Sequence, residues 1–123
     1  MPVLIADDSP NMRKMLKNAL RQFGVERIDE AEDGRAALGL MKQHAYGLVL
    51  LDWNMPAMTG IEVLRFMRAD DSLRDIPVMM LTAEADKKNV LEAMGAGVTD
   101  YLIKPFTMDA LKSKIDRIAR IPL

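Results

Sequence analysis

The chain has 123 residues, half of them hydrophobic, and a formal net charge of −1 at pH 7. This length and composition predict one globular domain over residues 1–123 with a sizeable core, without room for a second domain. No apolar stretch approaches the length needed to cross a bilayer. The balanced charge gives no reason to expect nucleic acid or an anionic membrane as partner, and the absence of cysteine excludes disulfides, thiol catalysis and thiolate metal sites.

Short apolar runs alternate with stretches of helical periodicity along the whole chain. In order, the pattern predicts a strand at 3–6, a helix from 10 to 23, a strand at 27–31, a helix from 34 to 41, a strand at 47–52, a helix from 60 to 67, a strand at 76–82, a helix at 87–96, a strand at 101–103 and a helix from 108 onward. Such alternation implies βαβ units with right-handed crossovers. The expected fold is therefore α/β, with a doubly wound, five-stranded parallel sheet.

Local signals mark several helix starts. Ser9 is expected to be an N-cap followed by Pro10 at the first helical position, and Thr107 is expected to cap the last helix. Thr59 and Glu62 match a capping box, in which each side chain satisfies a free amide near the other. These signals place helices directly after the first, third and fifth strands.

The helical stripes predict which side chains face the core. The expected core-facing residues are Met12, Met15, Leu16, Ala19, Leu20 and Phe23 in the first helix, Ile61, Leu64 and Met67 in the third, Val90, Leu91 and Met94 in the fourth, and Met108, Leu111, Ile115 and Ile118 in the fifth. The second helix is expected to run through Ala36, Ala37, Leu38, Leu40 and Met41. On the last helix, Lys112, Lys114, Arg117 and Arg120 are expected to face water. Most methionines are accordingly expected to fill the core.

The third predicted strand ends with a single carboxylate. Leu48–Leu51 are four consecutive aliphatic residues, which is typical of a parallel strand buried on both faces, and Asp52 follows them at once. Ligands of open α/β sheets bind outside the carboxyl ends of the strands, so Asp52 is a candidate for chemistry. The alternative is that Asp52 only stabilises the turn ahead of Pro56.

Other polar residues follow the neighbouring strands on the same predicted edge. They are Asp7 and Asp8 after the first strand, Thr82 after the fourth and Lys104 after the fifth. Carboxylates 5 Å apart repel by roughly 3 kcal/mol per pair at an effective dielectric of about 20, so folding stability does not favour the cluster. A bound Mg²⁺ would offset this repulsion. A carboxylate, a metal ion, a lysine and a hydroxyl together suffice for phosphorylation of one aspartate.

The motifs together resemble the receiver domain of bacterial response regulators. Those that carry the resemblance are Asp7-Asp8-Ser9, Asp52-Trp53-Asn54-Met55-Pro56 followed by Gly60, Thr82-Ala83-Glu84-Ala85, Tyr101, and Lys104-Pro105-Phe106-Thr107, and they span essentially the whole chain. Within that family the chain is most similar to the single-domain chemotaxis regulators. The resemblance implies a flavodoxin-like strand order of 2-1-3-4-5.

The resemblance also implies roles for individual residues. Asp52 would be the phosphoacceptor, and the other assigned residues are Asp7, Asp8, Asp52 and the Asn54 carbonyl for Mg²⁺, Thr82 and Lys104 for the phosphoryl oxygens, Thr82 and Tyr101 for the conformational switch, and Asn54 and Glu84 near the water that hydrolyses the phosphate. Asp7 would act through a water. The Lys104–Pro105 bond is expected to be cis, and the protein would catalyse only its own phosphorylation and dephosphorylation.

The implied partners are a sensor histidine kinase as phosphodonor, a flagellar motor switch protein as output and a phosphatase. A cytoplasmic monomer is expected, without nucleic acid or membrane. The output face would present Ala85, Lys87, Val90, Tyr101, Ile103, Phe106, Lys114 and Arg117. This apolar patch ringed by basic groups suits an acidic amphipathic peptide, although it also fits an ordinary solvated helix face.

The sequence leaves three alternatives to regulation of the flagellar motor. The chain could be the receiver of a larger regulator such as a DNA-binding transcription factor, with Ile121–Leu123 beginning a linker, but Asp109–Lys112 departs from the acidic-Leu pattern of dimerising receivers. It could also drain phosphate from a shared kinase. A phosphatase with an aspartate nucleophile is disfavoured, because such enzymes need a second acid where this chain has Asn54. Ser9 and Thr59 also depart from the chemotaxis pattern and leave the kinase and phosphatase open.

Overall fold

A computed structural model describes residues 1–83 and 87–119. The elements are β1 (Val3–Ala6), α1 (Pro10–Gln22), β2 (Ile28–Ala31), α2 (Gly34–Gln43), β3 (Leu48–Asp52), α3 (Gly60–Ala69), β4 (Val78–Thr82), α4 (Lys87–Gly95), β5 (Asp100–Ile103) and α5 (Met108–Ala119). Each predicted element is present, with shifts of a few residues at some ends. Within the described residues, no helix combines the length and the apolar character that crossing a bilayer requires.

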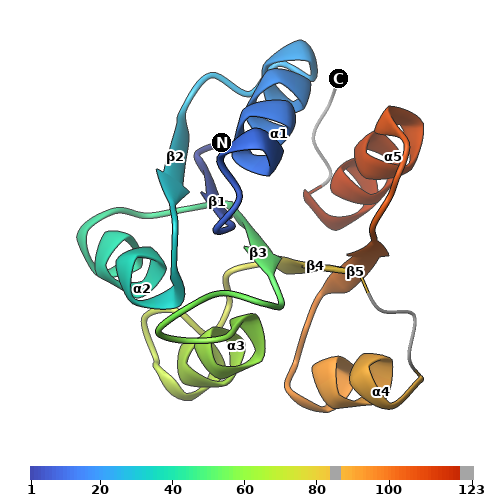
Figure 1. Cartoon of the computed structure of the whole chain (residues 1–123). Coiled ribbons are helices and arrows are strands. Elements are labelled where there is room, and N and C mark those ends of the chain that lie inside the picture. Colours follow the sequence, from blue (N-terminus) through green and yellow to red (C-terminus); the bar gives the residue numbers. More distant parts are fainter. Residues whose placement is uncertain (84–86, 120–123) are drawn as a thin grey trace.

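All neighbouring strands pair in parallel, and the strand order is β2-β1-β3-β4-β5. This is the doubly wound, flavodoxin-like α/β fold expected from the sequence. α1 and α5 cover one face of the sheet, and α2, α3 and α4 cover the other (Figure 1). The carboxyl ends of all five strands therefore meet at one edge.

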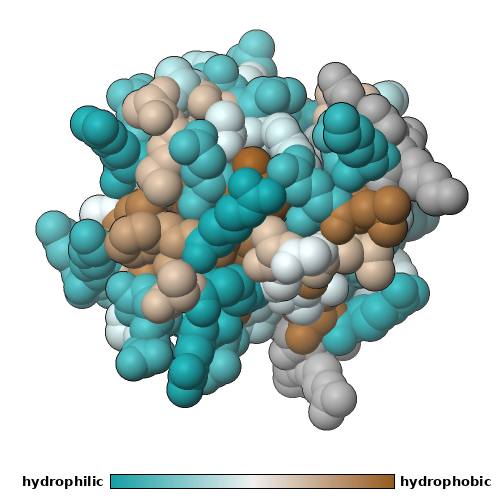
Figure 2. Space-filling model, turned by 90° about the horizontal axis from the view of Figure 1, so that it is seen from below, coloured by the Kyte–Doolittle hydropathy of each residue, from teal (hydrophilic) through white to brown (hydrophobic). Residues whose placement is uncertain are grey.

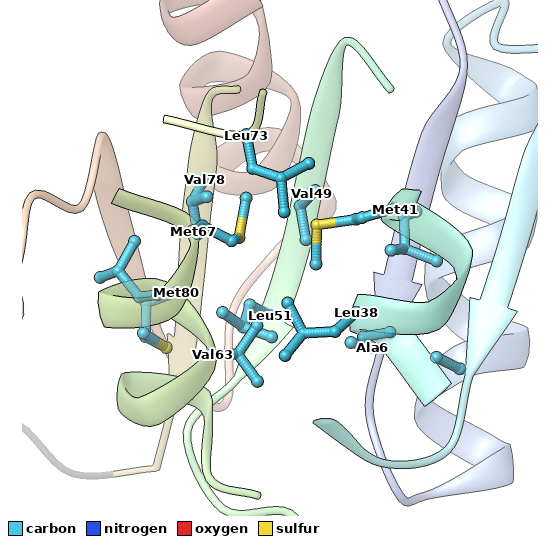
Figure 3. Close-up of a cluster of buried hydrophobic side chains, with 14 of the residues drawn as sticks. Ala6, Leu38, Met41, Val49, Leu51, Val63, Met67, Leu73, Val78 and Met80 are labelled. Carbon is cyan, nitrogen blue, oxygen red and sulfur yellow. The ribbon is translucent and has the colours of Figure 1, made fainter. Parts of the chain in front are cut away.

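The central strands are buried on both faces, which explains their uninterrupted apolar runs. Val49 and Leu51 point into a hydrophobic cluster with α2 and α3 (Figure 3), whereas Leu48 and Leu50 belong to the cluster under α1 and α5. β1, β3 and β4 are buried along their whole length, while β2 and β5 are the partly exposed edge strands. The sheet centre thus supplies a rigid platform for whatever follows β1, β3 and β4.

The predicted caps are present. The Ser9 side chain accepts the Met12 amide at the start of α1, and the Thr107 hydroxyl accepts the Ala110 amide at the start of α5. Thr59 and Glu62 form both halves of the capping box at the start of α3. Each cap lies in the loop that leaves the carboxyl end of a strand, so the caps also fix the loops around that edge.

The predicted stripe of α4 is wrong at two of its three positions. Leu91 and Met94 are exposed by 58% and 62%, and the residue that α4 buries is Ala93. Val90 is only half-buried. A small side chain at the contact lets the helix lie close to the sheet, and the larger side chains then fall on the outer surface.

Two further side chains expected in the core are outside it. Met15 in α1 and Met108 at the first position of α5 are 40% and 38% exposed. These residues lie at the margins of the predicted stripes, where one helical position decides between core and solvent. The remaining predicted core positions of α1, α3 and α5 are buried or half-buried.

Candidate functional site

The buried polar side chains of the described residues gather at one edge of the sheet. They are Asp7, Asp52 and Thr82, with exposures of 0%, 6% and 5%. Asp7 directly follows β1, whereas Asp52 and Thr82 end β3 and β4. Removing carboxylates from water raises the free energy unless they are paired, so this concentration indicates a site whose chemistry outweighs its cost in stability.

Lys104 pairs with both buried carboxylates. Its Nζ lies 3.2 Å from Asp7 Oδ2 and 3.1 Å from Asp52 Oδ1, and its side chain is only 20% exposed. The Lys104 amide donates to the Thr82 carbonyl at 2.7 Å, which continues the β4–β5 pairing into the loop. The following Lys104–Pro105 bond is cis, as the resemblance implied.

Asp7 accepts two further hydrogen bonds. Its Oδ1 accepts the Ser9 amide at 2.8 Å, and its backbone carbonyl accepts Arg13 Nη1 at 2.6 Å. Arg13 Nε in turn donates to Glu30 Oε1 at 3.3 Å. Sequence reasoning missed Arg13. The available signal was its position in the first turn of α1, from which a long side chain can reach back to the strand end.

Burial and the neighbouring charges shift two pKa values in the site. Burial and the neighbouring Asp7 raise the pKa of Asp52, against the opposing effect of Lys104. Burial on its own would lower the pKa of Lys104, but Asp52 and Asp7 outweigh it and raise that pKa. In the absence of another cation, the ammonium of Lys104 is therefore the group that keeps the two carboxylates together.

Gly60 allows the β3–α3 loop to fold back tightly against the strand end. A Cβ atom built at Gly60 would lie 2.2 Å from the Asp52 carbonyl oxygen and 3.0 Å from Met80 Sδ. The Gly60 amide also donates to the Trp53 carbonyl at 2.8 Å. Only glycine fits this close approach without moving the backbone that carries Asp52.

The acidic residues fit a divalent metal ion. Asp7, Asp8 and Asp52 each offer a carboxylate oxygen, and these oxygens lie within 4.8 Å of one another. Opposite ligands of an octahedral Mg²⁺ are about 4.2 Å apart, so a small inward movement or an intervening water completes the fit. Asp8 is exposed, which leaves the cluster open toward solvent.

The two residues predicted to form the conformational switch lie on adjacent strands. Thr82 pairs in register with Ile103, and Tyr101 pairs with Met80, so Thr82 and Tyr101 lie two positions apart on the same side of the sheet. Asn54 is exposed in the loop after β3. The structure therefore brings Thr82 to the edge that holds Asp52 and places Tyr101 further back along β5. Glu84 lies outside the described residues.

The predicted output face is partly apolar and partly basic. Val90, Tyr101, Ile103, Phe106 and Lys114 are half-buried, and Arg117 is exposed. Ala85, the Lys87 side chain, Arg120 and Ile121–Leu123 lie outside the described residues.

Leu91 and Met94 enlarge this face. Glu92 faces α3, where it pairs with Arg65 at 2.9 Å. Met94 and Val90 are each two positions from Glu92, or roughly 160° around the helix, so they point away from α3. Leu91 lies about 100° from Glu92, on the outer surface of the helix. Figure 2 views the α3 and α4 side and shows brown hydrophobic surface between teal side chains. Sequence reasoning missed these two residues because it assigned them to the core.

Comparisons with known proteins support the receiver-domain resemblance over nearly the whole chain. A family model described as "Response regulator receiver domain" matches residues 3–116. Chemotaxis protein CheY-3 of Vibrio cholerae serotype O1 is 47% identical over 118 residues, which cover 96% of this chain and 91% of that protein. Chemotaxis protein CheY of Pseudomonas aeruginosa is also 47% identical, over 96% of this chain and 95% of its own length.

A solved structure has the same fold with a metal at its site. It is the receiver domain of a sensor histidine kinase from Pseudomonas aeruginosa, with a magnesium ion coordinated in its active-site cleft. Its TM-score is 0.88 at 28% identity, and the match covers 98% of both chains.

Proposed function

Since this chain belongs to the response regulator receiver family, we propose that it is a phosphorylation-activated switch of a two-component system, with Asp52 as phosphoacceptor. The observation that carries the proposal is the pairing of two buried carboxylates with one lysine: Lys104 Nζ lies 3.1 Å from Asp52 and 3.2 Å from Asp7. Asp52 ends the central strand β3, and the Lys104 ammonium can stabilise negative charge that develops on an incoming phosphoryl group.

In the proposed reaction, a carboxylate oxygen of Asp52 attacks phosphorus. The new bond is O–P, and the bond that breaks is the P–N bond to a histidine of a sensor kinase, whose nitrogen leaves with the electron pair. Lys104 supplies a positive charge to the phosphoryl oxygens, and Thr82 supplies a hydroxyl donor. Asp7, Asp8, Asp52 and the Asn54 carbonyl would hold Mg²⁺, which when bound neutralises charge on the transferring group. Hydrolysis of the acyl phosphate, with Asn54 and Glu84 near the water, resets the protein.

The proposed output is a shift between two conformations. Moving such an equilibrium from mostly inactive to mostly active takes roughly 5 kcal/mol of differential stabilisation, which new bonds from Thr82 and Lys104 to the phosphoryl group would supply. Tyr101 would transmit the movement of Thr82 to the α4-β5-α5 face. The exposed Leu91 and Met94 on α4, together with Lys114 and Arg117 on α5, support an acidic amphipathic peptide as ligand.

We assign the output to the flagellar motor, because the curated relatives with 47% identity are chemotaxis proteins. In this assignment the protein works as a cytoplasmic monomer, receives phosphate from a sensor histidine kinase and is reset with help from a phosphatase. The ligand would be the N-terminal peptide of a motor switch protein.

Phosphotransfer can be tested by mass spectrometry. After treatment with acetyl phosphate and Mg²⁺, we expect the protein to gain one phosphoryl group, and we expect Asp52→Asn or chelation of Mg²⁺ to abolish the gain. Asp71→Asn is the matched control, because the Asp71 side chain is 96% exposed, paired with Arg74 and remote from the acidic cluster in sequence. A phosphoryl group that persists on Asp52→Asn would refute the assignment.

Output can be tested by titrating the motor switch peptide. We expect phosphorylation to tighten its binding by roughly 5- to 150-fold, the usual range of coupling between two sites. Equal affinity for the phosphorylated and unphosphorylated protein would exclude the motor switch as the regulated partner. It would leave the phosphoacceptor role standing.

A further inference from the structure

Lys114 contacts the ring of Tyr101 from outside the sheet. Tyr101 lies on the edge strand β5 and packs against the hydrophobic cluster beneath α2, α3 and α4. Lys114 belongs to α5, on the opposite face, and its Nζ lies 5.5 Å from the centre of the Tyr101 ring. This is the geometry of a cation–π contact, which favours the present ring position over others.

Asp100 holds Lys114 in that position. Its Oδ1 lies 3.1 Å from Lys114 Nζ and also accepts the Tyr101 amide at 2.7 Å. The Lys114 and Asp100 side chains are only 28% and 18% exposed, so water screens the pair less than it screens a surface ion pair. Because Asp100 precedes Tyr101 on the strand, carboxylate, ammonium and ring form one connected unit.

We propose that Asp100 is an internal competitor for Lys114, which keeps the ammonium over Tyr101 until an acidic group of the partner takes it. The inference rests on the proposed function, since it concerns how the output face is masked. In the resting protein, Asp100 neutralises a basic group that an acidic peptide needs, and Lys114 restrains the ring. A partner carboxylate that captures Lys114 therefore removes both restraints in one step.

The expected effects are modest and specific. A cation–π contact and a partly exposed ion pair each change an equilibrium by about 2- to 5-fold. Asp100→Asn removes the competing charge but keeps the shape and the hydrogen bond to the Tyr101 amide. Lys114→Met removes the cation but keeps an apolar stem.

The matched control for Lys114→Met lies on the same helix. Lys112 pairs with Asp116 at 3.1 Å. Lys112→Met therefore changes the net charge as Lys114→Met does but leaves the pair at Tyr101 intact. Asp109→Asn serves in the same way for Asp100→Asn, because Asp109 is an exposed acid in the first turn of α5.

The first measurement reads the ring directly in the unphosphorylated protein. Tyrosine is replaced by 3-fluorotyrosine, and the Tyr101 resonance is assigned by its loss in Tyr101→Phe, since the chain has two tyrosines. We expect Lys114→Met and Asp100→Asn to increase, by about 2- to 5-fold, the population of molecules whose Tyr101 ring has left the position described above. Lys112→Met should leave that population unchanged. An unchanged Tyr101 resonance in both variants would refute the restraint.

The second measurement uses the motor switch peptide with unphosphorylated protein. We expect Asp100→Asn to tighten binding by about 2- to 5-fold, Lys114→Met to weaken it by a similar factor, and Asp109→Asn to tighten it less than Asp100→Asn does. Equal tightening by Asp109→Asn and Asp100→Asn would reduce the effect to net charge and overturn the competition. If Asp52 accepted no phosphoryl group, the proposed function would fail, but both measurements would still decide whether the pair restrains Tyr101.

Discussion

Single residues at the acidic edge raise the free energy of the folded state. Asp7 and Asp52 are buried beside each other, and one ammonium serves both carboxylates. A partly buried charged pair of like sign is unfavourable in a medium less polar than water, so part of this cost remains after Lys104 is counted. Conditions that remove the charge of Asp52 should therefore stabilise the protein.

The first prediction concerns the pH dependence of stability. Because the folded-state pKa of Asp52 is raised, the folded protein takes up a proton before the unfolded chain does, and the destabilising effect of ionised Asp52 is relieved as pH falls from that pKa toward about 3.9. In metal-free buffer, Asp52→Asn should be more stable than the native protein at pH 7, with an advantage that shrinks on acidification. Urea unfolding at several pH values measures this. A pH-independent difference would contradict it, and Asp71→Asn should follow the native protein.

The second prediction concerns Ala57. Among the described residues, Ala57 is the one non-glycine with positive φ, at 66°, in the loop between β3 and α3. This conformation places Cβ against the backbone and costs an alanine roughly 1 kcal/mol more than a glycine. Ala57→Gly should therefore raise the free energy of unfolding by about 0.5–1 kcal/mol. Ala36→Gly, on the exposed side of α2, should lower it by a similar amount, and the same sign for both variants would contradict the argument.

At the scale of elements, α4 differs most from expectation. Its hydrophobic residues lie mainly on the surface, and its contact with the sheet is made by Ala93. The ion pair between Glu92 and Arg65 joins α4 to α3. Arg68 of α3 donates to the Gly97 and Ile76 carbonyls and so fixes the loop that follows α4. A helix with such a narrow buried face can move relative to the sheet at low cost, which suits an element of an output surface.

The third prediction separates the two faces of α4. Ala93→Leu should lower the free energy of unfolding by about 1–3 kcal/mol, because the added side chain has no space at a fully packed contact. Leu91→Ala should change it by less than about 0.5 kcal/mol, because Leu91 is exposed. Urea unfolding followed by circular dichroism measures both. A decrease of about 2–5 kcal/mol in the free energy of unfolding for Leu91→Ala would instead show that Leu91 is buried, as the helical pattern predicted.

At the scale of the whole molecule, the parallel topology converts separate strand ends into one site. Asp7 and Lys104 are 97 residues apart in sequence, yet their charged groups lie 3.2 Å apart. Nothing local holds them together. The site therefore exists only in the folded state, and any ligand that bridges its carboxylates should stabilise the entire fold.

The fourth prediction is that Mg²⁺ stabilises the protein. A ligand at 100 times its dissociation constant adds about 2.7 kcal/mol if it binds only the folded state. We expect thermal unfolding to shift upward with Mg²⁺ and the shift to disappear with chelator. Asp8→Asn should reduce the shift without disrupting the core, because Asp8 is exposed. NaCl at matched ionic strength is the control, and an equal shift with NaCl would exclude specific binding.

Much of this protein is determined by local sequence. The uninterrupted apolar run of β3, the Ser9 cap and the capping box at Thr59 depend on neighbouring residues alone, and with them the element order. Given that order, the helix that connects each strand to the next returns the chain to the same end of the sheet, which makes the strands parallel. The shared edge of Asp7, Asp52 and Lys104 therefore follows from topology without any side-chain coordinates.

Tertiary structure decided the contacts that depend on how elements lie against one another. The approach of α4 put Ala93 inside and Leu91 outside, although both are apolar and one helical turn cannot distinguish them. The pairing of Asp100 with Lys114 needs α5 to cross beside β5 at a distance that periodicity does not specify. Periodicity gives direction around a helix axis but not the distance between axes, and that distance determines which side chains meet.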